Sequence, residues 1–197
     1  YTPDQSGAVY QSTDMAERFS GFVPQLLNSL RKPADLQALI HDPDVIAQEK
    51  HDGERRPIRH ASGKTDGLNK EGVIVSLPMN VVAEIEALGR DLLMDGEIMG
   101  ERYVAFDLLE LDGHDLRARP YADRLELLTG LLDGAPLQQI ELVVTATTPA
   151  EKQKLLDDLK AHKAEGLVLK KKSEAYAPGR PASGGSQMKW KFIETCS

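Results

Sequence analysis

The chain has 197 residues, 41% of them hydrophobic and 28% charged, with a formal net charge of −7. This length and composition are typical of one or two soluble globular domains and exclude a disordered or fibrous chain. No apolar run approaches the roughly 20 residues of a membrane span, and the first residues lack the features of a signal peptide, so we expect a cytoplasmic protein. The single cysteine, Cys196, excludes a disulfide framework and a cysteine-based metal site within the chain.

The chain begins with a polar N-terminal arm, residues 1–20, and we predict a single domain over residues 21–197. The apolar spacing predicts a helix over 33–41 and a strand over 44–50 that runs into an Asp-Gly turn. Residues 61–72 have loop or hairpin chemistry, and residues 73–78 read as a short strand. A helix over 81–89 follows, with Asn80 as the predicted N-cap and Gly89 at its end.

In the second half, two apolar runs joined at Met99-Gly100-Glu101 predict an antiparallel hairpin over 92–111. Helices are expected over 120–132 and 149–162, the second begun by Pro149, with strands over 140–146, 165–171 and 188–193. Residues 173–187 are rich in Gly, Pro and Ser and predict a loop. Most strands follow one another without a crossover helix, so we predict an α+β fold of antiparallel sheets with helices on their outer faces.

The chain lacks the common glycine-rich motifs that bind phosphate. It contains neither GxxxxGK[ST] nor GxGxxG, so side chains must do much of any phosphate binding. Net acidity argues mildly against nucleic-acid binding, yet the last quarter of the chain is locally basic. From residue 165 to residue 191 six basic residues accompany only Glu165 and Glu174: Lys170, Lys171, Lys172, Arg180, Lys189 and Lys191.

One lysine, Lys50, stands between a predicted strand and the Asp52-Gly53 turn. A lysine becomes a nucleophile when burial or neighbouring cations, such as Arg55 here, favour its neutral form. Such a pattern more often marks a surface lysine beside a turn, so the hypothesis that Lys50 is a nucleophile depends on the rest of the chain.

Other features supply that support. Glu97 and Glu165 each adjoin a glycine on a predicted strand, and two carboxylates from separate strands make a hard-oxygen site suited to Mg²⁺. Phe106, on the second strand of the hairpin that carries Glu97, offers a face for stacking a base, although a core phenylalanine is equally consistent with the pattern. Lys189 and Lys191 alternate with apolar residues and share a strand face, as a cationic strip with Lys170 nearby. Together these residue types indicate nucleotidyl transfer from a nucleoside triphosphate.

Five sequence elements in this order resemble those of the nucleotidyltransferase (adenylation) domain of ATP-dependent DNA ligases, relatives of RNA ligases and mRNA capping enzymes. Residues 50–55 (KHDGER) match KxDGxR, 95–97 match DGE, 105–109 (AFDLL) match an FDLL-like element, 165–170 (EGLVLK) match EGxVxK, and 189–191 match KxK. Residues 69–72 (NKEG) are similar to the family's RxG element, with Lys70 in place of the arginine. The resemblance implies an ATP-grasp-like fold with the nucleotide pocket between sheets.

The resemblance also implies roles by position. Lys50 would attack the α-phosphorus of ATP and carry the AMP, which then passes to the 5′-phosphate of a nick in double-stranded DNA. The remaining nucleotide contacts would come from Gln48 at the base, Arg55 at the ribose or phosphate, Lys70, Glu97 at the ribose or a metal, Phe106 at the adenine, and Lys170, Lys189 and Lys191 at the phosphates. Glu97 and Glu165 would hold Mg²⁺ or Mn²⁺. We expect a monomer, with no membrane partner.

Alternatives remain open at this point. An RNA ligase domain would use the same residues, a capping guanylyltransferase domain would use GTP, and an inactive relative would bind nucleic acid only. Family ligases carry an OB-fold domain after the KxK strand, and this chain ends at KFIETCS. We therefore expect the domain by itself to bind nucleotide and to self-adenylate slowly.

Overall fold

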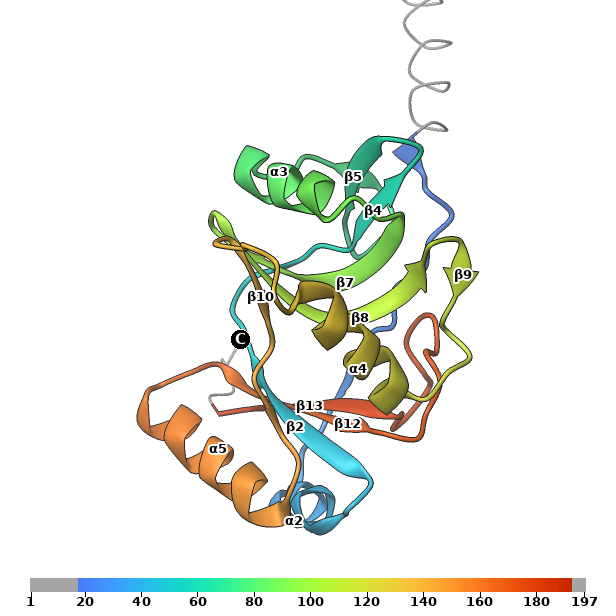
Figure 1. The fold of residues 1–197 in the computed structure, drawn as a ribbon. Helices are drawn as coiled ribbons and strands as arrows, with labels where there is room; N and C mark the ends of the chain where they lie inside the picture. Colours follow the sequence, from blue (N-terminus) through green and yellow to red (C-terminus); the bar gives the residue numbers. More distant parts are fainter. Residues whose placement is uncertain (1–17, 193–197) are drawn as a thin grey trace, which may run out of the picture.

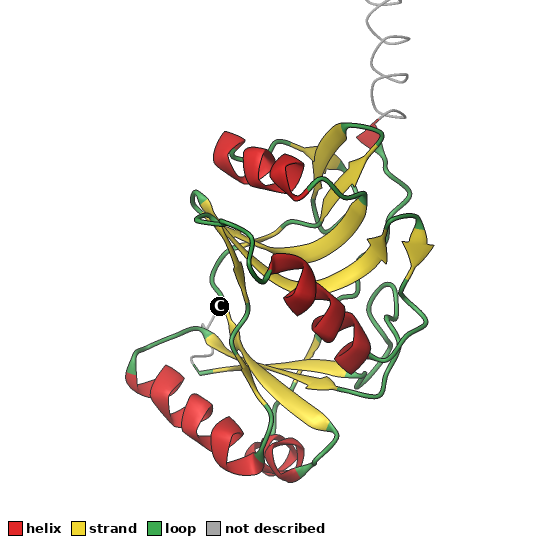
Figure 2. Cartoon of the chain, in the orientation of Figure 1, coloured by secondary structure: helices red, strands yellow, loops and turns green. Residues whose placement is uncertain are grey.

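The computed structural model describes residues 18–192, and the fold consists of two sheets with helices on their outer sides (Figure 1). Cys196 and nearly all of the predicted N-terminal arm lie outside the described residues. Figure 2 shows the strands gathered into a small sheet below and a large sheet above. No helix among the described residues has the length and apolar character needed to cross a membrane.

The small sheet has five strands in the order β1 (Asn28–Ser29), β13 (Gln187–Lys191), β12 (Gly166–Lys171), β2 (Val45–Lys50) and β11 (Thr145–Ala146). Two helices, α2 (Pro33–His41) and α5 (Pro149–Ala161), cover one face of it (Figure 1). Side chains of a strand alternate between faces, so Leu167 and Leu169 of β12 pack in the core with these helices. The side chains of Val168 and Lys170 consequently lie on the opposite face, toward the large sheet.

The large sheet has eight strands, and its main path runs β10 (Ile140–Leu142), β8 (Arg102–Leu111), β7 (Leu92–Met99), β4 (Ile58–Ala61), β5 (Lys64–Leu68) and β6 (Ile74–Val75). Off this path, β3 (Glu54–Arg55) pairs with β7 and β9 (His114–Asp115) pairs with β8. The helices α3 (Met79–Leu88) and α4 (Tyr121–Leu132) share a buried apolar core with β4, β7 and β8.

Most predicted elements are confirmed. The helix over 33–41 has the predicted bounds, the helix over 149–162 ends one residue earlier than predicted, and residues 61–72 contain the β4–β5 hairpin turn. Gly89 ends α3 in the left-handed conformation with φ +65°, as the glycine predicted. The overall class, α+β with mainly antiparallel sheets, is also confirmed.

Three local predictions were wrong. Asn80 lies inside α3 and caps nothing, because the helix begins at Met79 directly after Pro78, whose extended backbone precedes it. The predicted strand over 140–146 is two short strands in different sheets, since the chain crosses between sheets at Val143 and Val144. The strand predicted over 73–78 is only β6, which pairs with β5 at the sheet edge. Two pairings, β1 with β13 and β10 with β8, are parallel.

The Asp-Gly turn after Lys50 carries the chain from one sheet to the other. Lys50 ends β2 in the small sheet, and Arg55 belongs to β3, which pairs with β7 of the large sheet. A side chain at Gly53 would meet the carbonyl oxygen of Ile98 at 2.4 Å, so only glycine permits the turn to pack this closely. The turn therefore places Lys50 and Arg55, five positions apart in the sequence, in different sheets.

Candidate active site

Lys50 and Glu165 form an ion pair at the end of the small sheet. Their strands are antiparallel neighbours, with Lys50 opposite Gly166, and Lys50 Nζ lies 3.0 Å from Glu165 Oε1. Both side chains are largely buried, at 18% and 25% exposure. Glu165 was predicted on a strand, but it immediately precedes β12. A Cβ at Gly166 would lie 2.0 Å from the carbonyl oxygen of Trp190, so the close approach of β13 requires glycine beside this carboxylate.

Glu97, on β7, brings a second carboxylate to the same region from the large sheet. Burial raises the pKa of Glu97, and the charges of Lys50 and Arg55 oppose this shift. One oxygen of each carboxylate, Glu97 Oε2 and Glu165 Oε2, is buried and accepts no hydrogen bond from any described residue. Buried acceptors left open in this way suit a cation, so the two carboxylates fit a divalent metal ion. Among the described residues no cluster of three or more potential ligands exists, so such an ion would need further ligands from water or phosphate.

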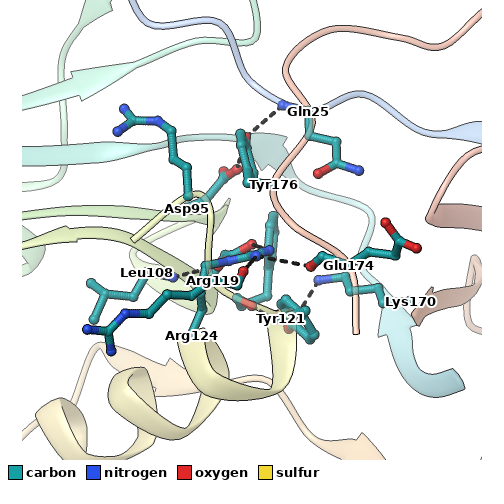
Figure 3. Close-up of polar contacts among 12 residues, drawn as sticks. Gln25, Asp95, Leu108, Arg119, Tyr121, Arg124, Lys170, Glu174 and Tyr176 are labelled. Carbon is teal, nitrogen blue, oxygen red and sulfur yellow. Dashed lines mark hydrogen bonds and ion pairs between the residues drawn. The ribbon is translucent and has the colours of Figure 1, made fainter. Parts of the chain in front are cut away.

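Arg55 is held by a carboxylate that the sequence reasoning did not single out. Its Nε and Nη2 donate to the two oxygens of Asp95 at 2.7 and 2.6 Å, and Nη2 also donates to the carbonyl of Gln25. Burial lowers the pKa of Arg55, but the charge and hydrogen bonds of Asp95 outweigh burial and raise it overall. Asp95 accepts a further hydrogen bond from the Tyr176 hydroxyl (Figure 3). Arg55 is therefore fixed in its charged form with its guanidinium 5.2 Å from the ring of Phe106.

A narrow cavity of about 60 Å³ lies beside Phe106. It is lined by residues of both sheets, including Gln48, Val168 and Lys170 from the small sheet and Phe106 from the large one. Phe106 is half-buried, so its ring is not simply part of the core. The inner surface of the cavity is mainly apolar and includes one aromatic face, while polar side chains such as Gln48 and Lys170 border it, which suits a flat heterocycle.

Lys170 belongs to this narrow cavity. Its ammonium lies 4.3 Å from the centre of the Phe106 ring, and the side chain is almost wholly buried. Burial lowers the pKa of Lys170 to about 7, although the charges of Asp107 and Asp95 work against this effect. Its predicted contact with phosphates stays a prediction, since the ammonium lies under the aromatic ring rather than in the larger cavity described next.

A larger cavity of about 480 Å³ opens next to the first. It is lined by six cationic side chains and three acidic ones: Lys50, Arg55, Arg56, Lys70, Arg180 and Lys189, with Glu54, Glu71 and Glu97. The two cavities share Lys50, Arg55 and Glu97, so they form one site. The narrow cavity beside the Phe106 ring is one end of the site, and the larger cavity with its cationic side chains is the other. This arrangement suits a base at one end and several phosphates at the other.

The two lysines of the KxK element differ in their positions. Lys189 lines the larger cavity, and its pKa is lowered by burial and then by the nearby charges of Lys191, Lys50 and Arg180. Lys191 is exposed and lines neither cavity. The structure thus brings together Gln48, Lys50, Arg55, Lys70, Glu97, Phe106, Glu165, Lys170 and Lys189, while Lys191 acts on the site through its charge.

Several residues at the site were missed by sequence reasoning. Asp95 belongs to the DGE element of the sequence, but its role was not apparent because its partner Arg55 is 40 positions away. Arg180 and Tyr176 come from the glycine-rich loop, and Tyr121 begins α4; no local pattern distinguishes them. Arg56 lines the larger cavity, donates to Glu54, and has a buried Nε without a partner among the described residues.

Comparison with known proteins gives a consistent picture. Residues 100–191 match the family model for the ATP dependent DNA ligase domain. Over 79 residues, 40% of this chain, the sequence is 35% identical to the multifunctional non-homologous end joining protein LigD of Mycolicibacterium smegmatis, of which it covers 10%. A probable DNA ligase of Sorangium cellulosum is 38% identical over 80 residues, 40% of this chain and 14% of that protein. The chain therefore spans only a small part of these relatives.

Solved structures share the fold. A mycobacterial DNA ligase D, complexed with ATP and MES, superposes with a TM-score of 0.71 at 21% identity, covering 89% of this chain and 62% of that one. Chlorella virus DNA ligase-adenylate gives a TM-score of 0.60 at 18% identity, with 86% and 67% coverage. The chain is therefore similar to ATP-dependent DNA ligases in sequence over residues 100–191 and in the fold of the described residues.

Proposed function

We propose that the chain is the adenylation domain of an ATP-dependent DNA ligase and that Lys50 carries the AMP. In the first step Lys50 Nζ attacks the α-phosphorus of ATP. The N–P bond forms while the bond from the α-phosphorus to the bridging oxygen breaks, and pyrophosphate leaves. Nζ loses its proton in this step, and Glu165 Oε1, 3.0 Å away, is positioned to accept it.

The position of Lys50 is the observation that carries the proposal. It lines both cavities, at the junction between the narrow cavity beside Phe106 and the larger cavity with the cationic side chains. A nucleotide with its base beside Phe106 and its phosphates among Lys70, Arg180 and Lys189 would bring its α-phosphorus to this junction. Holding the reacting atoms in one place converts a bimolecular reaction into a step within a complex.

The metal is assigned to Glu97 and Glu165. Their open, buried oxygens support this, and Mg²⁺ is commonly held by one or two carboxylates together with water and substrate phosphates. When bound, the ion would supply neutralising charge for the phosphates and the departing pyrophosphate. Arg55, oriented by Asp95, would supply a fixed positive charge near the ribose or the α-phosphate.

DNA is the proposed acceptor. The AMP would pass from Lys50 to the 5′-phosphate at a nick in double-stranded DNA, and attack by the adjacent 3′-hydroxyl would release AMP and seal the strand. The names of the relatives support DNA as the substrate, and the cationic side chains Arg56, Lys70 and Arg180 at the open cavity supply charges for a phosphate backbone. We propose that the domain acts as a monomer.

Nucleotide labelling tests the proposal. Incubation with α-labelled ATP and Mg²⁺ is expected to label the chain covalently, and Lys50→Ala is expected to abolish the label. Lys64→Ala, at an exposed hairpin, is the matched control and should label like the wild type. Label retained by Lys50→Ala would contradict the assignment. Stronger labelling by GTP would indicate a guanylyltransferase, and sealing of RNA nicks in preference to DNA nicks would indicate an RNA ligase.

A further inference from the structure

One buried hydroxyl joins three residues of the narrow cavity. Tyr121, the first residue of α4, belongs to none of the sequence elements discussed above, and its side chain is buried. Its hydroxyl donates to the carbonyl oxygen of Phe106 at 2.5 Å, and Gln48 Nε2 lies 2.8 Å from the same oxygen. Lys170 Nζ approaches it at 3.4 Å, and Figure 3 shows this contact.

Hydrogen-bond accounting at this hydroxyl fixes the orientation of Gln48. A tyrosine hydroxyl has one hydrogen, and the Phe106 carbonyl can only accept, so that hydrogen is committed to Phe106. Toward Gln48 the hydroxyl can then only accept, and an amide donates only through its nitrogen. The amide must therefore turn Nε2 toward Tyr121, where it also reaches Thr145 Oγ1 at 3.1 Å. The carbonyl oxygen Oε1 is the polar atom left for the cavity that Gln48 lines.

We propose that Tyr121 is a positioning residue that holds the Gln48 amide with Oε1 toward the base, so that the site selects a purine with a 6-amino group over a 6-oxo purine. This rests on the proposed function, because it assumes a nucleotide in the site. A 6-amino group donates a hydrogen bond to Oε1, whereas a 6-oxo group would set one acceptor against another. An unpaired buried acceptor is costly, so the orientation of one amide translates into base selectivity.

Tyr121→Phe tests the inference with ATP and inosine triphosphate, which carries an oxygen in place of the 6-amino group. Without the hydroxyl, the Gln48 amide is free to turn over and to offer Nε2 to a 6-oxo group. The ATP-to-inosine-triphosphate ratio of kcat/KM for covalent labelling is expected to fall by about tenfold, mainly through KM. Tyr103→Phe is the matched control, because the Tyr103 hydroxyl is buried and has no hydrogen-bond partner among the described residues. It should leave the ratio unchanged.

A second substitution distinguishes the loss of the Gln48 amide orientation from a general disturbance of the site. A carboxylate presents an oxygen whichever way it turns, so Gln48→Glu in the Tyr121→Phe background is expected to restore the preference for ATP. A folded Tyr121→Phe variant with an unchanged ratio would overturn the inference, as would failure of Gln48→Glu to restore the preference.

A measurement on the wild-type chain does not depend on a variant or on catalysis. Nuclear Overhauser contacts from the Gln48 Nε2 protons to the Tyr121 ring are expected with and without AMP, and an amide turned the other way would overturn the inference. If the wild type forms no adduct with ATP while these contacts are present, the proposed function fails and the orientation of Gln48 stands.

Discussion

Glu165 Oε1 contacts Lys50 Nζ at 3.0 Å, while Oε2 of the same carboxylate is buried without a partner among the described residues. One glutamate thus faces the proposed nucleophile with one oxygen and leaves the other for a cation. Because the ion pair holds Nζ at the junction of the two cavities, the position of the nucleophile is set before any nucleotide enters.

Glu165→Gln keeps the shape of this side chain and removes its charge. We expect covalent labelling by ATP to slow by about 100-fold, the lower end of the range that a positioned acid or base contributes. Glu54→Gln, an exposed carboxylate at the rim of the larger cavity, is the control and should label at nearly the wild-type rate. Labelling of Glu165→Gln within about threefold of wild type, well below that range, would contradict the role.

The buried pair Arg55 and Asp95 predicts a loss of stability on Asp95→Asn. The asparagine leaves the largely buried guanidinium without its counter-charge, which typically costs 3–5 kcal/mol, so we expect a decrease of about that size in the free energy of unfolding in urea. Asp112→Asn breaks a second Arg–Asp pair, with Arg90, whose side chains are 43% and 45% exposed. Because solvent screens this pair, that control should lose much less stability than Asp95→Asn. Equal losses of stability in the two variants would show that burial does not determine how much the Arg55–Asp95 pair contributes to the free energy of unfolding.

Lys170 predicts a pH-dependent stability. Its pKa is lowered by burial from 10.5 to about 7, so between these values the unfolded chain binds a proton that the folded chain lacks. The free energy of unfolding contributed by Lys170 therefore rises with pH across this window, by at most about 1.4 kcal/mol per pH unit, and is constant below it. We expect the difference in free energy of unfolding, wild type minus Lys170→Met, to increase from pH 7 to pH 10.

Lys64→Met, a change at an exposed lysine, is the control and should show no such slope. Urea titrations at several pH values measure both differences. A wild type that loses stability relative to Lys170→Met as the pH rises would reverse the predicted sign and contradict the lowered pKa.

Two glycines predict opposite effects of the same substitution. Gly166→Ala places a Cβ 2.0 Å from the Trp190 carbonyl, so we expect a loss of about 1–3 kcal/mol and slower labelling, since the strand next to Glu165 must shift. Gly130→Ala, inside α4, meets no atom within 4 Å. Because alanine is the better helix former, we expect that change to stabilise the chain by roughly 0.5–1 kcal/mol. Thermal unfolding of the two variants measures both effects.

Sequence alone predicted the elements whose signals are local. The helix over 33–41, the helix begun by Pro149 and the hairpin over 92–111 each follow from periodicity and turn residues within the element itself. Lys50 was singled out because it precedes the Asp52-Gly53 turn, and Glu97 and Glu165 because each stands beside a glycine in a short pattern. The structure explains these glycines at Gly53 and Gly166, where strands approach too closely for any side chain.

What depends on distant partners could not be predicted. Residues 140–146 look like one strand, but their two halves pair with different sheets, which no local pattern specifies. Tyr121 reads as an ordinary helix residue, and its role depends on Gln48 and Phe106 reaching it from two sheets. The two Lys–x–Lys positions share a strand face as expected, yet only Lys189 lines a cavity, because Lys191 stands at the exposed end of β13.

The most direct measurement of the central claim is the site of the adduct itself. After incubation of the chain with ATP and Mg²⁺, peptide mapping by tandem mass spectrometry is expected to locate AMP on the Nζ of Lys50 alone. The adduct should be stable to base and labile to acid, as a phosphoramide is. AMP on another residue, or a chain that binds ATP without forming an adduct at Lys50, would contradict the account.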